Sequence, residues 1–152
     1  MPHIHEKIDF TVSVFVVYKR RVLLRKHEKY HIWLGVGGHV ELDENPNLTA
    51  IREVKEEVGL DIKLVQTKDL PVYSKKDHIE LIPPEFMNIH QINETHQHCD
   101  MTFFATTESD AVVPEDPNDK WEWLSMTDLE EKKAELREDI YFYAKKALLT
   151  VE

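Results

Sequence analysis

Apolar side chains near the N-terminus follow the spacing of β-strands. Valine occupies every second position from Val12 to Val16, and a second aliphatic run covers residues 22–24. Alternation of this kind is typical of a strand with one face on the core. The basic residues 19–21 interrupt the two runs. The pattern therefore predicts a β-hairpin over residues 10–25 with a solvated basic turn.

A helix is predicted over residues 46–58 by signals at both of its ends. Asn45 is a good N-cap, Pro46 suits the first helical position, and Gly59 suits a C-terminal cap. After it, short apolar runs between polar or proline-containing turns predict strands at 62–65, 79–82, 86–92, 101–105 and 120–124, then a final helix over 128–149. This order predicts an α+β fold, layered α/β/α, in which a mixed β-sheet lies between helices.

Length and composition indicate an ordinary globular protein. The chain has 152 residues, 41% hydrophobic and 32% charged, so we expect one domain over residues 1–152. The formal net charge of −10 argues against nucleic-acid binding, which needs clustered Lys and Arg. An acidic protein that acts on phosphates would need metal ions to offset the repulsion. A cluster of carboxylates is therefore the feature that such an activity predicts.

Cysteine usage and apolar segments bear on the compartment. Cys99 is the only cysteine, so the chain can form no internal disulfide and nothing indicates an oxidising environment. The longest apolar stretch, Val14 to Tyr18, has the length of a strand, and the first ten residues have no signal-peptide core. We expect a cytoplasmic protein without a membrane span.

Three carboxylates share one face of the predicted helix. At about 100° per residue, Glu53, Glu56 and Glu57 fall together. The aliphatic residues that fall roughly opposite, and so predict the buried face, are Ile51, Val54 and Val58. Like charges at these spacings disfavour a helix by about 0.2–0.5 kcal/mol per pair, and a divalent cation would compensate. The alternative is a solvated acidic face.

The residues around these glutamates decide between the two alternatives. The spacing G-x5-E-x7-R-E-U-x-E-E-x-G-U, where U is aliphatic, is occupied by Gly38, Glu44, Arg52, Glu53, Val54, Glu56, Glu57, Gly59 and Leu60. This segment, residues 38–60, resembles the complete Nudix box. Such a match arises by chance on the order of 10⁻⁹ per window from typical residue frequencies. The flanking hairpin, strands and final helix are also similar to that family.

The resemblance implies the Nudix fold and hydrolysis of a nucleoside diphosphate linked to another group, with Mg²⁺ or Mn²⁺ as cofactor. It implies that Glu53, Glu56 and Glu57 bind the metal, joined by a backbone carbonyl near Gly37. Metal ions neutralise the diphosphate and make bound water easier to deprotonate, and a carboxylate can take the proton. Our hypothesis for the general base is Glu53.

Other residues of the box are expected to support this site. Arg52 and Glu56 are four apart, so their contact could orient a ligand, the alternative being a surface ion pair. Glu44 could assist the metal site or the loop before the helix. Gly37 and Gly38 would let the backbone approach metal or phosphate, or simply form a tight turn. Gly37 and Gly38 are therefore candidate substrate-binding residues.

A second group of candidates lies beyond the box. Strand alternation would place His96, His98 and Asp100 on one face. This His-x-His-x-Asp pattern could hold a metal, water or phosphate, or could be a polar strand face. We include His98, Asp100 and Arg25 as candidate substrate-binding residues. Cys99 would point the other way, and no activating partner for a nucleophilic thiol is evident.

The leading hypothesis is a metal-dependent pyrophosphohydrolase that converts NDP-X and water to NMP and P-X. Compact substrates such as nucleoside triphosphates are favoured. The alternative is a non-catalytic Nudix-like sensor that binds a nucleotide and regulates a partner, although the box has lost no carboxylate. Isoprenoid diphosphate isomerisation would ordinarily need a catalytic cysteine, and Cys99 lacks the context. We expect a small-molecule nucleotide partner, neither nucleic acid nor membrane, and a monomer or homodimer.

Overall fold

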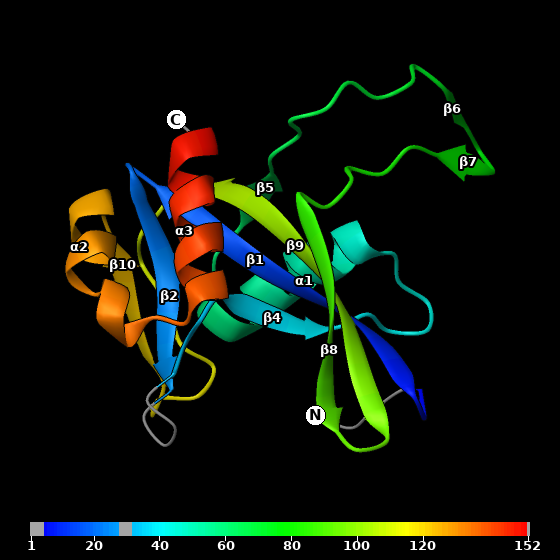
Figure 1. The fold of residues 1–152 in the computed structure, drawn as a ribbon. Coiled ribbons are helices and arrows are strands. Elements are labelled where there is room, and N and C mark those ends of the chain that lie inside the picture. The colour runs from blue at the N-terminus through cyan, green and yellow to red at the C-terminus, as the bar shows by residue number, and fades with distance from the viewer. Residues whose placement is uncertain (1–4, 28–31, 152) are drawn as a thin grey trace.

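A mixed β-sheet forms the centre of the molecule (Figure 1). The computed structural model describes residues 5–27 and 32–151, which form an eight-stranded sheet with the path β10-β2-β1-β9-β5, with β3 on β2, β4 on β1 and β8 on β9. β1 and β9 pair in parallel, and the other pairs are antiparallel. The strands are β1 Ile8–Tyr18, β2 Arg21–His27, β3 Ile32–Leu34, β4 Val36–His39, β5 Ile62–Leu64, β8 Phe86–Asn93, β9 His96–Thr107 and β10 Lys120–Leu124.

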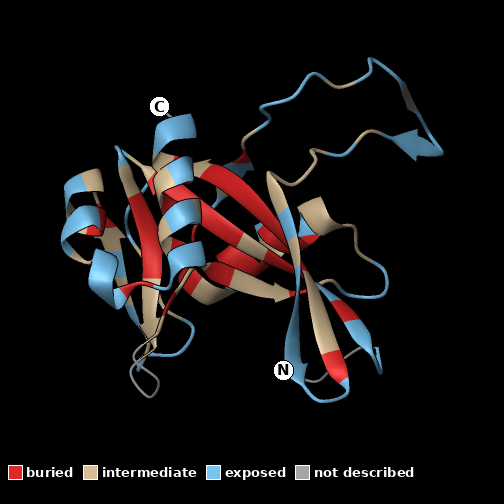
Figure 2. Ribbon diagram, in the orientation of Figure 1, coloured by how far each residue is buried: buried red, intermediate tan, exposed pale blue. Residues whose placement is uncertain are grey.

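Helices cover both faces of this sheet. Helix α1, Pro46–Val58, packs on one face through a core that includes Val12, Val14 and Val54. Helices α2, Met126–Glu131, and α3, Glu138–Thr150, cover the other face. The buried strands between them are visible in Figure 2. Strand alternation explains the two cores, because odd and even positions of β1 point to opposite faces. The α+β, α/β/α prediction is confirmed.

The predicted hairpin is present, with a two-residue turn. Tyr18 pairs with Arg21, and Lys19 and Arg20 between them have φ values of 45° and 63°. Two consecutive left-handed residues are the signature of a type I′ turn, whose twist matches that of antiparallel strands. Both turn side chains are exposed, as expected for a solvated turn.

Helix α1 begins and ends where its capping residues predict. The side chain of Asn45 accepts a hydrogen bond from the backbone N–H of Leu48 at 3.0 Å. Gly59 adopts φ 72°, and its N–H donates to the carbonyl of Lys55 at 3.0 Å. These two caps satisfy backbone groups that a helix end otherwise leaves without partners. The helix that carries the box is therefore fixed at both termini.

The prediction of one continuous helix over 128–149 is wrong. The chain forms α2, a 3₁₀ turn η1 over Lys133–Glu135, and then α3. Leu136, between η1 and α3, is extended and buried in the same core as Leu129 and Ile140. These three positions keep the spacing of one helical face, so helical periodicity does not reveal the break. The break allows α2 to pack beside α3, whereas the two would run end to end in one straight helix.

The strand predicted over 79–82 is also wrong. Only a two-residue ladder forms there, between β6, Ser74–Lys75, and β7, His78–Ile79, on an arm that projects from the domain (Figures 1 and 2). The side chain of Asn47 hydrogen-bonds both the N–H and the carbonyl of Ile82, at 2.8 and 2.9 Å. The Asn47 amide thus satisfies the backbone N–H and carbonyl of Ile82, which would otherwise be free to pair with a neighbouring strand.

Among the described residues, no helix has both the length and the apolar character required to cross a bilayer.

Candidate active site

Arg52 connects the carboxylates of the box. Its Nε and Nη2 donate to the two oxygens of Glu44 at 2.8 and 2.7 Å. Its Nη1 donates to Glu53 at 2.9 Å and to Glu56 at 3.1 Å. The expected contact of Arg52 with Glu56 is thus present, and it is one of several. Nη2 also donates to the backbone carbonyl of His39 at 3.1 Å. A rigid guanidinium fork suits this set of partners better than an ammonium would.

The pairing of Arg52 with Glu44 is the strongest of these contacts. Hydrogen bonds from the guanidinium lower the pKa of Glu44 to about 2, and the carboxylate in turn raises the pKa of Arg52. Thr49 also donates to Glu44 at 2.8 Å. Because Glu44 stays ionised and doubly bonded, it holds Arg52 in place. The structure thus gives Glu44 the contacts of a supporting residue.

The buried face of α1 differs from the prediction. Ile51 is 42% exposed, whereas Glu53 is only 4% exposed. Ala50, Val54 and Val58 form the centre of the buried face, so Glu53 lies on one flank of it and Ile51 on the other. The prediction counted Ile51 equally with Val54 and Val58, and it therefore placed the centre of the buried face part of a turn away from its position in the structure.

Gly38 makes room for the Glu53 side chain. A Cβ at position 38 would lie 2.1 Å from the Glu53 Cδ and 2.2 Å from Oε1. No side chain larger than hydrogen can therefore occupy position 38 while this carboxylate stays where it is. Burial raises the pKa of Glu53, with the nearby Arg52 charge acting in the opposite direction. Glycine at position 38 is thus needed for the Glu53 carboxylate to occupy its present position.

Glu57 lies where the box meets a cavity. Burial raises the pKa of its carboxyl to about 7, against the opposing effects of the Arg25 charge and of a hydrogen bond from the Gly37 backbone. Arg25 also pairs with Asp119 at 3.3 Å and lies over the Trp121 ring. A half-buried carboxylate whose ionisation is disfavoured is a group that a divalent cation would keep charged.

The three glutamates do not converge on one point. Among the described residues, none of the groups of donor atoms gathered within 4.8 Å combines Glu53, Glu56 and Glu57. Arg52 instead bridges Glu53 and Glu56. The three carboxylates are thus separate from one another along α1.

A cavity of about 740 Å³ opens between the sheet and α3. Its lining includes Glu57, Arg25, Gly37 and Gly38. Its other lining residues are mostly polar and come from β1, β4, β8, β9 and α3; they include Thr11, His39, Asn88, His90, Gln91, His98, Asp100, Arg137 and Tyr143. The volume is in the range that small ligands occupy. The cavity therefore brings the box together with His98, Asp100 and Arg25.

The expected alternation along β9 is present. His98 and Asp100 both line the cavity, and His96 follows the same period on β9. Asp100 is buried and accepts from the Thr11 hydroxyl at 2.6 Å. Burial raises its pKa, and hydrogen bonds from Thr11 and Ser13 act against the rise. Cys99, on the opposite face, is half-buried.

Two residues near the site were missed from the sequence. Asp9 is 1% exposed and lies 3.3 Å from the Nε2 of His39. Position 39 lies inside the box between fixed positions, where any residue is compatible with the pattern. Asp9, Thr11 and Ser13 are polar residues at every second position, and they alternate with the apolar residues of the same strand. This alternation could have predicted a polar face on β1 that includes Asp9.

Comparison with known proteins identifies the family. Residues 7–145 match the sequence profile of the NUDIX domain. The chain belongs to the Nudix family. The resemblance carried by residues 38–60 is thereby confirmed, and it extends over nearly the whole chain. The Nudix box of this protein is the segment of β4, α1 and their connection described above.

Relatives agree with this assignment. A crystal structure of a Nudix-family hydrolase from Clostridium perfringens is 36% identical, with a TM-score of 0.80 over 95% of this chain and 98% of that one. A dihydroneopterin triphosphate diphosphatase from Haemophilus influenzae is 37% identical over 96 residues, which span 62% of this chain and 58% of that enzyme. The MutT protein from Methanosarcina mazei Go1, 16% identical with a TM-score of 0.65 over 95% of each chain, shares the Nudix fold.

Proposed function

We propose that this protein hydrolyses a phosphoanhydride in a compact nucleoside diphosphate derivative, NDP-X, to NMP and P-X. The observation that carries the proposal is the placement of Glu57, which joins the box to a 740 Å³ cavity beside Arg25. Similarity to a relative named for a triphosphate substrate supports a triphosphate as the substrate, in which X is the terminal phosphate. Net charge and the acidic box support a small-molecule substrate rather than a nucleic acid.

The residues present fit a divalent cation, Mg²⁺ or Mn²⁺, at the box. Glu53 and Glu57 are carboxylates whose pKa burial raises, and hard oxygen donors suit these ions. Glu53, Glu56 and Glu57 would hold the ion with the Gly37 backbone carbonyl. When bound, the ion neutralises the diphosphate and makes water easier to deprotonate. Family membership is consistent with a divalent metal.

The protein side chains supply positioning and proton transfer. Arg52, locked by Glu44, orients Glu53 and Glu56. In our proposal water attacks phosphorus, its proton passes to the carboxylate of Glu53, and the bridging P–O bond breaks with the electron pair leaving on the bridging oxygen. Arg25 lies near Glu57 at the cavity and would pair with a phosphate oxygen.

The rest of the cavity would hold the organic part of the substrate. Asn88 and Gln91 bring side-chain amides from β8, and Tyr143 brings an aromatic ring from α3. Amides can pair with both donors and acceptors of a heterocyclic base, and an aromatic ring can pack against it. His98 and Asp100 also line the cavity and would contact the sugar or phosphate region.

The test is a substrate panel with Mg²⁺ or Mn²⁺ and products identified by mass. The panel includes nucleoside and pterin triphosphates, dinucleoside polyphosphates, ADP-ribose, nucleotide sugars and NADH. We expect metal-dependent release of a monophosphate, abolished in Glu56→Gln and Glu57→Gln. Ligand binding with no turnover of any member would overturn the proposal in favour of a nucleotide sensor.

A further inference from the structure

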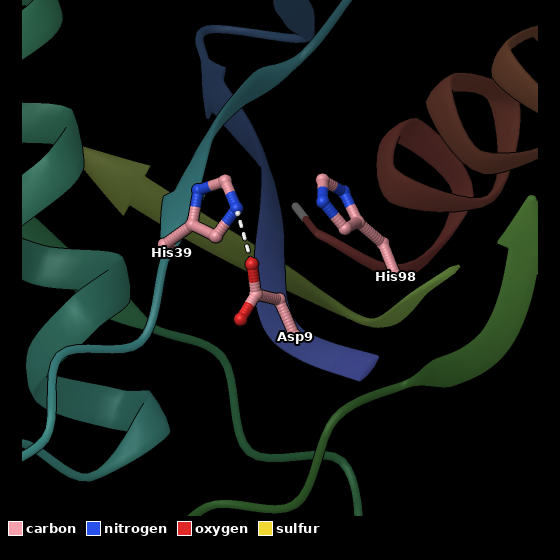
Figure 3. Close-up of side chains that lie close together, drawn as sticks. All are labelled: Asp9, His39 and His98. Carbon is pink, nitrogen blue, oxygen red and sulfur yellow. Dashed lines mark ion pairs between the residues drawn. The ribbon is translucent and has the colours of Figure 1, made fainter. Parts of the chain in front are cut away.

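A second group of side chains that could hold a metal lies next to the box and includes His39. The carboxylate of Asp9 faces imidazole rings from two other strands (Figure 3). Its Oδ2 is 3.3 Å from Nε2 of His39 and 3.2 Å from Nε2 of His96. One donor atom from each of Asp9, His39 and His98 lies within 4.8 Å of the others. We call Asp9, His39 and His98 the histidine cluster.

Strand register brings these three residues together. The parallel pairing of β1 with β9 places Asp9 beside His98. The antiparallel pairing of β1 with β4 places Thr11 beside His39. Asp9 and Thr11 are two positions apart, so they share a face of β1. The cluster is thus held by three neighbouring strands of one sheet, a rigid support for a metal site.

The carboxylate of the histidine cluster and one of its rings are buried. Asp9 is 1% exposed, and His39 is 9% exposed. A buried carboxylate must be compensated by hydrogen bonds, protons or a cation. Its Oδ1 accepts from the backbone N–H of His5 at 2.6 Å, and its Oδ2 faces the rings. A divalent metal bound beside Oδ2 would supply such a cation.

The donor set favours a transition metal over Mg²⁺. Two imidazoles and one carboxylate suit Zn²⁺, Co²⁺, Ni²⁺ or Fe²⁺, whereas Mg²⁺ and Ca²⁺ take oxygen ligands. In a tetrahedral zinc site, donor atoms about 2.0–2.1 Å from the ion are about 3.3 Å apart. The Asp9–His39 separation already has this value. All three donor atoms of the cluster lie within 4.8 Å of one another.

We propose that the histidine cluster is a binding site for a divalent transition metal, with zinc as the representative ion, separate from the glutamate site of the box. His96, whose Nδ1 lies 2.9 Å from the Glu6 carbonyl and whose Nε2 lies 3.2 Å from Oδ2 of Asp9, would orient that carboxylate. Such supporting partners are typical of metal sites. His39 and His98 line the cavity, so a fourth position of the metal faces it and accepts an oxygen donor from water or a ligand. This proposal stands without the proposed hydrolase activity.

Cobalt provides a probe that does not depend on turnover. Co²⁺ is titrated into chelator-treated protein with Mg²⁺ in millimolar excess, and visible ligand-field absorption is recorded. We expect wild type to bind one equivalent of Co²⁺ with imidazole-type absorption bands, and Zn²⁺ to displace it. The double variant Glu56→Gln/Glu57→Gln should keep these bands. His98→Asn should weaken binding by at least about tenfold.

Controls separate this result from misfolding and from surface binding. His78→Asn removes an exposed histidine on the projecting arm and should leave the titration unchanged. His39→Asn tests a second ligand if His98→Asn does not fold, as judged by circular dichroism and thermal unfolding without metal. Absence of the bands in wild type, their persistence in both histidine variants, or their loss in the glutamate double variant would each overturn the proposal. Loss of turnover alone would concern the hydrolase proposal only.

Discussion

The box and the histidine cluster meet at one residue and are built in opposite ways. The box takes its donors from a single helix and the loop before it, so its residues are close in sequence. The histidine cluster takes one donor from each of three strands, and Asp9 and His98 are far apart in the chain. His39 joins them, because its ring belongs to the cluster while its carbonyl accepts from Arg52 at 3.1 Å.

The difference teaches which sites a sequence can reveal. Helical spacing and caps are local, so the box could be recognised within residues 38–60. A site assembled by sheet register leaves no such local pattern. The two sites also differ in chemistry: oxygen donors and an arginine on one side, imidazoles and a buried carboxylate on the other. Variants that affect one site and leave the other intact would sharpen this contrast.

The largest effect is expected for Glu57→Gln. Removing the carboxylate that reaches the cavity should lower kcat by at least about 100-fold, since charge stabilisation at the reacting group is lost. Without metal, the free energy of unfolding should stay the same or increase. Partial burial disfavours the ionised form of Glu57 and raises its pKa to about 7, and glutamine has no charge to desolvate. Steady-state kinetics and thermal unfolding check the two outcomes.

A matched control for that variant is Glu94→Gln, which alters an exposed glutamate in the β8–β9 turn and should change neither quantity. Full turnover in Glu57→Gln would contradict the role given to Glu57.

Arg52→Lys comes next in size. Lysine keeps the charge and loses the fork that holds Glu44, Glu53 and Glu56. We expect the Mg²⁺ concentration for half-maximal activity to rise by about 10- to 100-fold, the range typical of residues that orient metal ligands. Arg21→Lys, at an exposed pair with Asp110, is the control. Equal Mg²⁺ dependence in both variants would show that Arg52 orients nothing.

Gly38→Ala tests the packing beneath Glu53. The added methyl group would overlap the Glu53 carboxyl, and a flexible side chain can move away. We expect the protein to fold while its apparent Mg²⁺ affinity falls by about tenfold. Cobalt binding at the histidine cluster should be retained. A Mg²⁺ titration of activity beside a Co²⁺ titration makes the comparison, and unchanged Mg²⁺ affinity would contradict it.

The smallest effect is expected far from both sites. Ser125 caps α2: its side chain accepts from the Asp128 N–H at 3.1 Å, and Asp128 accepts from the Ser125 N–H at 2.9 Å. Ser125→Ala should lower the free energy of unfolding by about 1 kcal/mol. Metal affinities and kcat should not change. Denaturant unfolding measures the loss, and a change in kcat would link α2 to the active site.

Much of the fold could be predicted because its signals are local. The hairpin, α1 and most strands of the sheet follow from alternation and from Asn45, Pro46 and Gly59. The break near Leu136 could not, since Leu129, Leu136 and Ile140 keep the spacing of one helical face across it and the contact of α2 with α3 has no local signal. At Ile82 no long strand forms, and the backbone instead bonds to Asn47, which is 35 residues away in the sequence. Neither has a local signature.

The same reason limits prediction of the candidate site. The glutamates and Arg52 follow from the box, and alternation placed His98 and Asp100 on one face. Burial of Glu53 depends on where α1 meets β4, which helical periodicity leaves undetermined. Asp9 joins His98 only through a parallel pairing that no turn or spacing indicates. Their meeting becomes visible only in three dimensions.

That parallel pairing also sets an order of events during folding. The bond between Thr11 and Asp100 spans 89 residues, and closing so long a loop costs entropy before any contact repays it. The caps of α1 and the two-residue turn at Lys19 and Arg20 need no such closure, so those elements can form early. We expect β1 and β9 to join late, and a partly folded chain to contain the helix of the box before it has a histidine cluster or a closed substrate cavity.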